Sequence, residues 1–356
     1  MMNIFFLILL IILLGATLIL ALSLRHSNTK MYSIAFRKKN SPNDYFWLDK
    51  DYSFEEYEVD TKGRYWLADP FLFEYGGKNY VFYEAYDLWT YKGNIGFSII
   101  DSENKRLTPP EIVLERAYHF SWPYIFEHDG EIYIMPETCK DYKVRLFRAV
   151  NFPHEWTEDE ILINDICACD SILVHGSRGE EYLLASDKYC HNTPTGTYPS
   201  CFVKNTLFTF KPGAKFQLEP NGKIDPAGKI VAVGDYGIRN AGKVFTAQGM
   251  MIRPGQDCTN GEYGRGIVFF RVNSTEPYSE EELFRLDCEN VGSHLKQNYT
   301  AKLTGLHTYN ENQKYEVIDF SGMRQNPFTG RIIRNINRVW QMCEILRNKL
   351  FLFRKS

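Results

Sequence analysis

The sequence lacks the short motifs that mark several common enzyme classes. It has no GxxxxGK[ST] phosphate-binding loop, no HExxH zinc motif and no GxSxG nucleophile turn. The glycines at residues 261–266 do not have dinucleotide-fingerprint spacing, and the single DxD, Asp49-Lys50-Asp51, precedes the repeated region and is interpreted as a chance match. We therefore expect neither a metal nor a cofactor.

The cysteines form no zinc or redox motif, because the eight of them include no CxxC pair. Cys190 and Cys201 flank a turn-rich loop and could pair in an oxidising compartment. Asn273-Ser-Thr and Asn298-Tyr-Thr match the N-glycosylation sequon, which has meaning only in a eukaryotic lumen. These features leave the compartment open.

Acidic residues are absent from the first 39 positions, which hold five Lys or Arg. Residues 331–356 hold seven Lys or Arg and one Glu, so an acidic body lies between two basic ends. The formal net charge of −3 argues against nucleic acid as a partner. Aromatic residues make up 15% of the chain, which suits β-strands and contact with sugar faces.

Residues 3–24 carry no charge at all. At about 1.5 Å per residue such a helix is long enough for a bilayer, which predicts a retained transmembrane anchor over residues 1–24 rather than a signal peptide. All five basic residues follow the segment, which favours a cytoplasmic body. A glycan-related role would equally allow a lumenal or extracytoplasmic body, so the side stays open.

Two further segments flank the body. Residues 25–45 are predicted to be a basic linker. Residues 328–356 are predicted to form a basic amphipathic helix, which either lies on an anionic membrane or packs against the body. Its apolar stripe consists of Ile332, Ile336, Val339, Cys343, Leu346, Leu350 and Phe353.

Five segments of the body repeat one plan of strand, turn and strand, beginning near Ala68, Ser121, Cys169, Arg239 and Leu303. The first two turn at Gly76-Gly77 and Asp129-Gly130, which favour tight hairpins. The spacing fits about one four-stranded blade per repeat. The sequence therefore predicts an all-β fold, a five-bladed β-propeller over residues 46–325; the rivals are a β-sandwich and a β-helix.

The chain resembles the N-terminal domain of the glucosamine inositolphosphorylceramide transferase family, which is similar to the propellers of invertase- and arabinanase-type glycoside hydrolases. The resemblance covers about residues 46–320. The motifs that carry it are Ala68-Asp69-Pro70-Phe71-Leu72-Phe73, Tyr83-Glu84-Ala85, residues 126–133, Met135-Pro136-Glu137, residues 253–257, Tyr263-Gly264 and residues 305–310.

Propeller hydrolases use an Asp of the first blade as base or nucleophile and a Glu as acid. The resemblance assigns these roles to Asp69 and Glu137. The second repeat has Trp122 where a family-like Asp would lie, so Asp170 of the third repeat is the substitute. Each of these carboxylates could instead cap a turn.

The remaining candidates are substrate-binding residues. Acidic side chains at the tips of the repeats are expected to converge on one cavity. Trp122 could stack on a sugar or pack in the core, and two arginines could bind anionic groups or neutralise the acidic channel. His307 could orient a substrate or a carboxylate, or be a structural histidine. The predicted set is Glu84, Trp122, Asp187, Arg239, Arg253, Asp257 and His307.

The sequence thus favours a membrane-tethered, glycan-engaging propeller in glycan or glycolipid assembly. In the resembled family the sugar-transfer catalyst is a separate C-terminal domain, so a separate glycosyltransferase is an expected partner, beside a glycan or glycolipid substrate and the membrane. The alternatives are a glycoside hydrolase with paired carboxylates and a non-catalytic carbohydrate-binding or scaffolding propeller.

Overall fold

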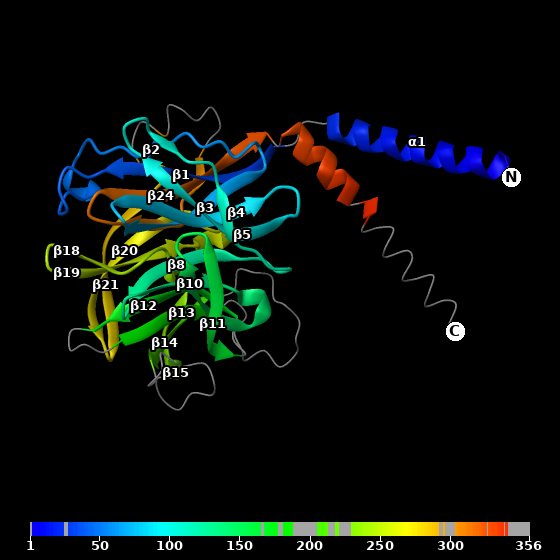
Figure 1. Cartoon of the computed structure of the whole chain (residues 1–356). Coiled ribbons are helices and arrows are strands. Elements are labelled where there is room, and N and C mark those ends of the chain that lie inside the picture. Colours follow the sequence, from blue (N-terminus) through cyan, green and yellow to red (C-terminus); the bar gives the residue numbers. More distant parts are fainter. Residues whose placement is uncertain are drawn as a thin grey trace.

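A computed structural model describes the fold, and it places most of the chain. The described residues are 2–24, 28–164, 167–176, 181–187, 205–212, 218–220, 229–291, 295, 303–325, 327–337 and 339–340. Their strands form five antiparallel sheets, and the predicted all-β propeller is confirmed (Figure 1). Strands such as those over residues 65–75 and 78–87 are buried on both faces in their middle, which suits a chain rich in Tyr, Phe and Ile.

Four sheets are each made from one continuous stretch of chain. The first contains β3 (Tyr65–Tyr75), β4 (Lys78–Asp87), β5 (Lys92–Asp101), β6 (Arg106–Leu107) and β7 (Glu111–Leu114). The second contains β8 (Ser121–His128), β9 (Glu131–Glu137), β10 (Lys143–Asn151) and β11 (Glu155–Asn164). The third contains β12 (Ala168–His175), β13 (Glu181–Asp187), β14 (Asn205–Pro212), β15 (Leu218–Pro220) and β16 (Lys229–Gly234). The fourth contains β17 (Tyr236–Asn240), β18 (Phe245–Ala247), β19 (Met250–Asp257), β20 (Gly266–Thr275) and β21 (Tyr278–Asp287).

The remaining sheet, here called the closing sheet, combines the two ends of the body. It contains β1 (Asn28–Lys38), β2 (Glu55–Glu56), β22 (Leu303–Gly305), β23 (Tyr309–Glu311) and β24 (Tyr315–Gln325). Strand β1 pairs with β24 along its whole length, from Asn28 opposite Gln325 to Lys38 opposite Tyr315. The prediction of a basic linker over residues 25–45 is therefore wrong, because most of that segment is a strand that closes the ring.

The basic residues at the end of β1 have structural partners. Arg37 lies 2.7 Å from Glu316, and Lys39 lies 2.8 Å from Glu311. The sequence pattern shows only a cluster of positive charge here, because the acidic partners come from a segment about 270 residues further along the chain.

Hydrogen bonds join neighbouring sheets all the way around the ring. They run from Trp122 N to Asp69 Oδ2 (3.1 Å), Trp122 Nε1 to Ser171 O (3.0 Å), Asn240 Nδ2 to Asp170 O (2.8 Å), Tyr309 N to Ala241 O (2.6 Å) and Asn310 Nδ2 to Pro70 O (2.7 Å). The core lies between adjacent sheets, where residues such as Phe71, Ile134 and Leu183 are fully buried.

Short helical turns complete the body: η1 (Phe46–Leu48), η2 (Cys139–Asp141) and η3 (Thr259–Gly261). A disulfide joins Cys139 in η2 to Cys167, just before β12, and so links the second and third sheets. The predicted partners Cys190 and Cys201 lie outside the described residues.

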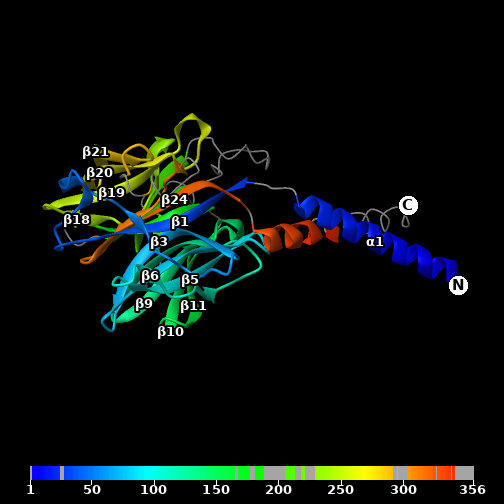
Figure 2. The ribbon, with the colours of Figure 1, turned by 90° about the horizontal axis from the view of Figure 1, so that it is seen from above.

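Two helices lie outside the ring on the same side of the sheets, as both views show (Figures 1 and 2). Helix α1 covers Met2–Leu24, and a second helix covers residues 328–337. Asn335 Nδ2 donates to Ser23 Oγ at 3.0 Å, which ties the two together. The second helix begins where the sequence predicts it, but residues 341–356 of that prediction lie outside the described part.

The predicted transmembrane anchor is not supported. In the part of the chain that the structure describes, no helix meets both the length and the apolar character needed to cross a membrane.

Replacing Ile34 by Ala tests the role of β1. Ile34 is 2% exposed in the middle of the strand, so the change should lower the free energy of unfolding by about 2–5 kcal/mol, as for other buried Ile-to-Ala changes. The exposed Thr29 on the same strand offers a control, because T29A should change the free energy by less than about 0.5 kcal/mol. Equal, small effects in chemical denaturation would show that β1 does not belong to the fold.

Candidate functional site

A cavity of about 340 Å³ is lined by residues of all five sheets and of the loops beside them. Its wall is made of aromatic, acidic and basic side chains. They are Tyr32, Trp66, Asp69, Glu84, Tyr86, His119, Ser121, Glu137, Cys139, Lys140, Asp170, Arg239, Tyr263 and His307. The predicted convergence of Asp69, Glu84, Glu137 and Asp170 on one cavity is therefore observed.

The first three sheets share one local distortion at the cavity. Asp69, Trp122 and Asp170 occupy equivalent positions with φ of 50°, 51° and 51°, each at a register shift between the first two strands of its sheet. Such bulges turn a strand and redirect its side chains. Asp tolerates positive φ better than bulky residues do, so the motif suits Asp69 and Asp170 more than Trp122.

Asp69 is bonded to two other sheets. Its Oδ2 accepts from Trp122 N at 3.1 Å, and its Oδ1 accepts from Thr308 Oγ1 at 2.9 Å. Its own N–H donates to Asp319 Oδ2 at 3.1 Å. These hydrogen bonds hold the carboxyl group in one orientation. The residue is also buried, with only 5% of its surface exposed.

His307 and Asp319 form a buried ion pair beside Asp69. His307 Nδ1 lies 2.5 Å from Asp319 Oδ2 and 3.8 Å from Asp69 Oδ1. The N–H groups of His307 and Thr308 both donate to Asp319 Oδ1 at 2.9 Å. Tyr32 stacks on the His307 ring, with 4.6 Å between ring centres.

These contacts give the carboxyl groups of Asp69 and Asp319 different pKa values. Burial raises the pKa of Asp69 to about 7, with the charge of His307 opposing this and those of Asp319 and Asp170 adding to it. Burial would also raise the pKa of Asp319, but the charge and hydrogen bonds of His307 outweigh it and lower that pKa. Asp69 can consequently hold a proton at neutral pH while Asp319 stays ionised.

Asp170 is paired with Arg239. Arg239 Nε lies 2.6 Å from Asp170 Oδ2, and Arg239 also comes within 3.8 Å of Glu137. Gln256 Nε2 donates to the same Asp170 oxygen at 3.2 Å. Burial raises the pKa of Asp170, and Arg239 opposes that rise. Arg239 thus connects two of the three predicted catalytic carboxylates.

An aromatic wall faces these charges. Trp66 stacks on Tyr86 with ring centres 4.4 Å apart and planes 7° apart, and Tyr32 lies 5.3 Å from Trp66. Tyr263 lies edge-on to His307 at 5.2 Å, and Arg239 lies over the Tyr263 ring. Flat aromatic faces beside polar groups are suited to sugar rings, which have apolar faces and hydroxyl edges.

Glu84 and His119 form another pair of polar side chains in the cavity wall. His119 Nε2 lies 3.2 Å from Glu84 Oε1, and His119 Nδ1 accepts from Gly93 N at 3.0 Å. Because Nδ1 is an acceptor, the neutral ring carries its proton on Nε2, the nitrogen that lies near Glu84.

Other predicted site residues do not reach the cavity. Trp122 is fully buried and packs edge-on against Phe71. Arg253 is fully buried and pairs with Glu280 at 2.6 Å, and Asp257 pairs with Arg285 at 2.8 Å. None of these three residues lines the cavity.

The structure describes the backbone of Asp187, which ends β13 opposite Ala168 and Thr206, but its side chain lies outside the described part. The roles of the residues that do line the cavity stay predictions.

Two clusters could in principle hold a metal. Ligand atoms of Asp69, His307 and Asp319 lie within 4.8 Å of one another, as do those of Cys139, Cys167 and Cys169. In each cluster two of the side chains already interact with each other. His307 and Asp319 form an ion pair, and Cys139 and Cys167 form a disulfide.

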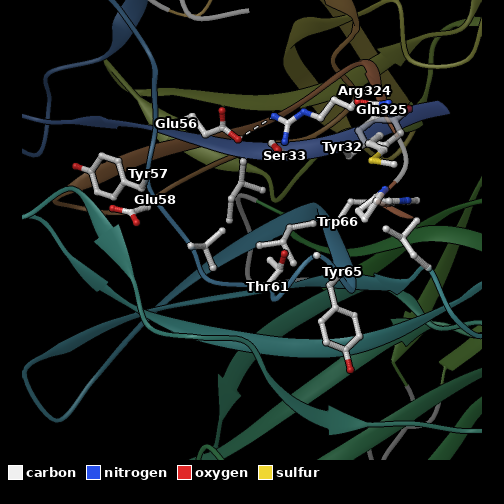
Figure 3. A pocket seen from close by; sticks show the side chains of 17 residues that line it. Tyr32, Ser33, Glu56, Tyr57, Glu58, Thr61, Tyr65, Trp66, Arg324 and Gln325 are labelled. Atoms are coloured by element: carbon white, nitrogen blue, oxygen red, sulfur yellow. Dashed lines mark hydrogen bonds and ion pairs between the residues drawn. The ribbon is translucent and has the colours of Figure 1, made fainter. Parts of the chain in front are cut away.

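A larger cavity of about 520 Å³ lies on the other side of Tyr32 and Trp66 (Figure 3). Residues of β1, residues 56–67 and the end of β24 line it, and Arg324 pairs with Glu56 across it at 2.9 Å. Since Tyr32 and Trp66 line both cavities, they form the wall between them.

Several cavity residues escaped prediction. Trp66 lies directly opposite Tyr86 in the β3–β4 ladder, one pair beyond Leu67 and Ala85 and two beyond Ala68 and Glu84. Period-two alternation from Glu84 therefore could have identified both aromatics. Tyr32 could not be found this way, because the sequence offered no sign that β1 belongs to the ring.

Fold and site together define a β-propeller with an acidic, aromatic-walled central cavity. The chain belongs to the family described as "Glucosamine inositolphosphorylceramide transferase 1, N-terminal", which matches residues 57–301.

Curated relatives named Glucosamine inositolphosphorylceramide transferase 1 agree with this assignment. The protein of Oryza sativa subsp. japonica is 33% identical over 225 residues, 62% of this chain and 28% of that protein. The Arabidopsis thaliana protein is 34% identical over 217 residues, 61% of this chain and 26% of that protein. The matched part thus spans less than a third of either relative.

Solved structures with a similar fold include RS223-Beta-xylosidase, with 11% identity and a TM-score of 0.49 over 74% of this chain and 92% of that chain. Another is the alpha-L-arabinanase of Cellvibrio cellulosa, with 13% identity and a TM-score of 0.43 over 61% and 77%. These likenesses are too weak to support a statement about activity.

Replacing Asp69 by Asn should change how stability depends on pH. The folded carboxyl group keeps its proton up to about pH 7, whereas the unfolded chain releases it near about pH 4. Between these values Asp69 makes the free energy of unfolding fall as pH rises, by at most about 1.4 kcal/mol per pH unit.

D69N removes this contribution. The stability of the wild type relative to the variant should therefore decline from about pH 4 to 7, measured by denaturant unfolding at a series of pH values. Parallel curves for the two proteins would contradict the raised pKa.

Proposed function

We propose that the central cavity binds a glycan or the glycan headgroup of a glycolipid, in a process of glycan or glycolipid assembly. The observation that carries this is the stack of Trp66 and Tyr86 beside Asp69, Glu84 and Glu137 in one cavity. A sugar ring lying on the aromatic pair would present its hydroxyl groups to these polar side chains.

The protonation of Asp69 favours binding of the uncharged hydroxyl groups of a ligand. With a pKa of about 7, its carboxyl group can both donate and accept a hydrogen bond near neutral pH. Arg239 offsets the charge of Asp170, so the cavity is less acidic than its residue types suggest. The names of the curated relatives, which are transferases, support a place in glycolipid assembly.

The transferring activity itself belongs, in this proposal, to a separate glycosyltransferase partner. A specific observation keeps glycoside hydrolysis as the second candidate: Asp69 and Glu137 line the same cavity, as an acid and a base must. Against it, Asp170 is bound to Arg239 and Gln256, which leaves it poorly placed to assist.

We also propose two finer features. The closing sheet acts as a fifth blade, supported by its hydrogen bonds to the first and fourth sheets. The apolar helix α1 associates the protein with a membrane, supported by the uncharged residues 3–24 and by leucines such as Leu14 and Leu18, which are 62% and 57% exposed.

Membrane association is checked by extracting membranes that contain the full chain. Alkaline carbonate should leave the protein in the pellet, and detergent should release it, because an apolar helix is held by its burial in lipid. Release by high salt or carbonate alone would refute the association.

Replacing Trp66 by Ala should weaken glycan binding about tenfold, or about 1.4 kcal/mol, because it removes half of the stack. A suitable probe is an inositol phosphate that bears glucosamine, measured by titration calorimetry. W340A is a matched control, since Trp340 is 67% exposed outside the ring and should bind as the wild type does. Equal affinity of W66A and the wild type would contradict the proposal that the glycan binds in this cavity.

The same preparation separates binding from hydrolysis. If the propeller only binds, the wild type should release no sugar, and D69N and E137Q should only weaken binding. Sugar release by the wild type that is lost in both variants would establish the hydrolase instead.

A further inference from the structure

The compartment in which the ring lies has its own structural signs, independent of what the cavity binds. The first is the disulfide between Cys139 and Cys167. Disulfides form and persist in oxidising compartments and are rare where glutathione keeps thiols reduced. This one joins two sheets at the cavity, since Cys139 lies in the cavity wall.

The second sign concerns the basic residues after α1. They were the reason to expect a cytoplasmic body, but Arg37 and Lys39 each have an acidic partner in the closing sheet. The fold thus accounts for two of these five residues, which weakens the charge argument for a cytoplasmic body.

The third sign is the sequon Asn273-Ser274-Thr275. Asn273 is exposed near the end of β20, beside the turn to β21. The β20–β21 register shifts between Val272 and Ser274, so Asn273 lies in a bulge without a paired residue opposite. Its Oδ1 accepts from Arg271 Nε at 3.0 Å on the surface.

The position of this sequon is compatible with the cavity. Strand β20 begins at Gly266, three residues after the cavity residue Tyr263, and Asn273 is the eighth residue of the strand. A glycan on Asn273 would therefore extend from the end of the sheet that is remote from the cavity mouth.

From these signs we infer that Asn273 carries an N-linked glycan and that the ring lies in an oxidising, lumenal compartment. The donor is a polyprenyl-diphosphate oligosaccharide. The Asn273 Nδ2 forms a bond to the sugar C1, the bond from C1 to the diphosphate oxygen breaks, the amide gives up one proton, and the polyprenyl diphosphate leaves. Asn298, the other sequon, lies outside the described residues.

The test uses the full chain expressed in eukaryotic cells and a glycosidase that removes N-glycans. The wild type should gain mobility on a gel after this treatment, and T275V should lose that shift while keeping nearly the same side-chain shape. T275S and S274A preserve the sequon and are the matched controls, which should keep the shift. T275V, T275S and S274A are each made in a T300V background, and the T300V protein is their reference, so that Asn298 contributes no shift.

A second readout reports the compartment when glycosylation is unclear from the gel. Thiols are alkylated in denaturant before and after reduction, because Cys139 and Cys167 are buried in the folded chain, and peptides are mapped by mass spectrometry. Cys139 and Cys167 should become alkylated only after reduction, as expected for a disulfide.

Three results would overturn the inference: no glycosidase shift in the T300V reference protein, a shift that survives T275V in that background, or Cys139 and Cys167 alkylated without reduction. None of these readouts depends on glycan binding in the cavity, so a failure here leaves the proposed function untouched, and a failure of W66A leaves this inference untouched.

Discussion

The contacts of Asp69 are the constraint on which the ring depends most. This one residue accepts hydrogen bonds from the second sheet and the closing sheet and donates one to the closing sheet. Three sheets that share one side chain cannot shift independently, so the cavity beside it has a fixed shape. The left-handed backbone at Asp69 is what turns its carboxyl group toward the axis.

Several buried carboxyl groups lie close together in the cavity, where their mutual repulsion and loss of hydration would destabilise the fold. Each of them is stabilised by its own immediate surroundings. Asp319 obtains a charged partner in His307, Asp170 obtains one in Arg239, and Asp69 instead retains a proton. Buried charges without partners would be very costly, so each solution removes one of them. The result is a cavity with donors and acceptors of several strengths, which is what a ligand with many hydroxyl groups needs.

Much of the architecture could be predicted from the sequence, because the strands and turns of each hairpin follow from short, local patterns. The hairpins that begin near Ala68, Ser121 and Cys169 have runs of apolar residues on either side of glycine-containing segments, and they form β3–β4, β8–β9 and β12–β13. The cavity carboxylates Asp69, Glu84, Glu137 and Asp170 followed from the same repeat.

What could not be predicted depends on contacts between distant segments. Strand β1 pairs with β24 across nearly 300 residues, and nothing in residues 25–45 signals that partner. Trp122, Arg253 and Asp257 were expected at the cavity, but each is buried and none of them lines it. The Cys139–Cys167 bond likewise depends on two sheets becoming neighbours.

The pairing of Asn28 with Gln325 places the first and last residues of the ring next to each other. Lys30, two residues from that start, reaches the carbonyl of Tyr263 in the cavity wall. Any polypeptide joined to either end of the ring would therefore emerge at the same rim. A neighbouring domain could approach a bound ligand from one direction with only a short connecting segment, whichever end carried it.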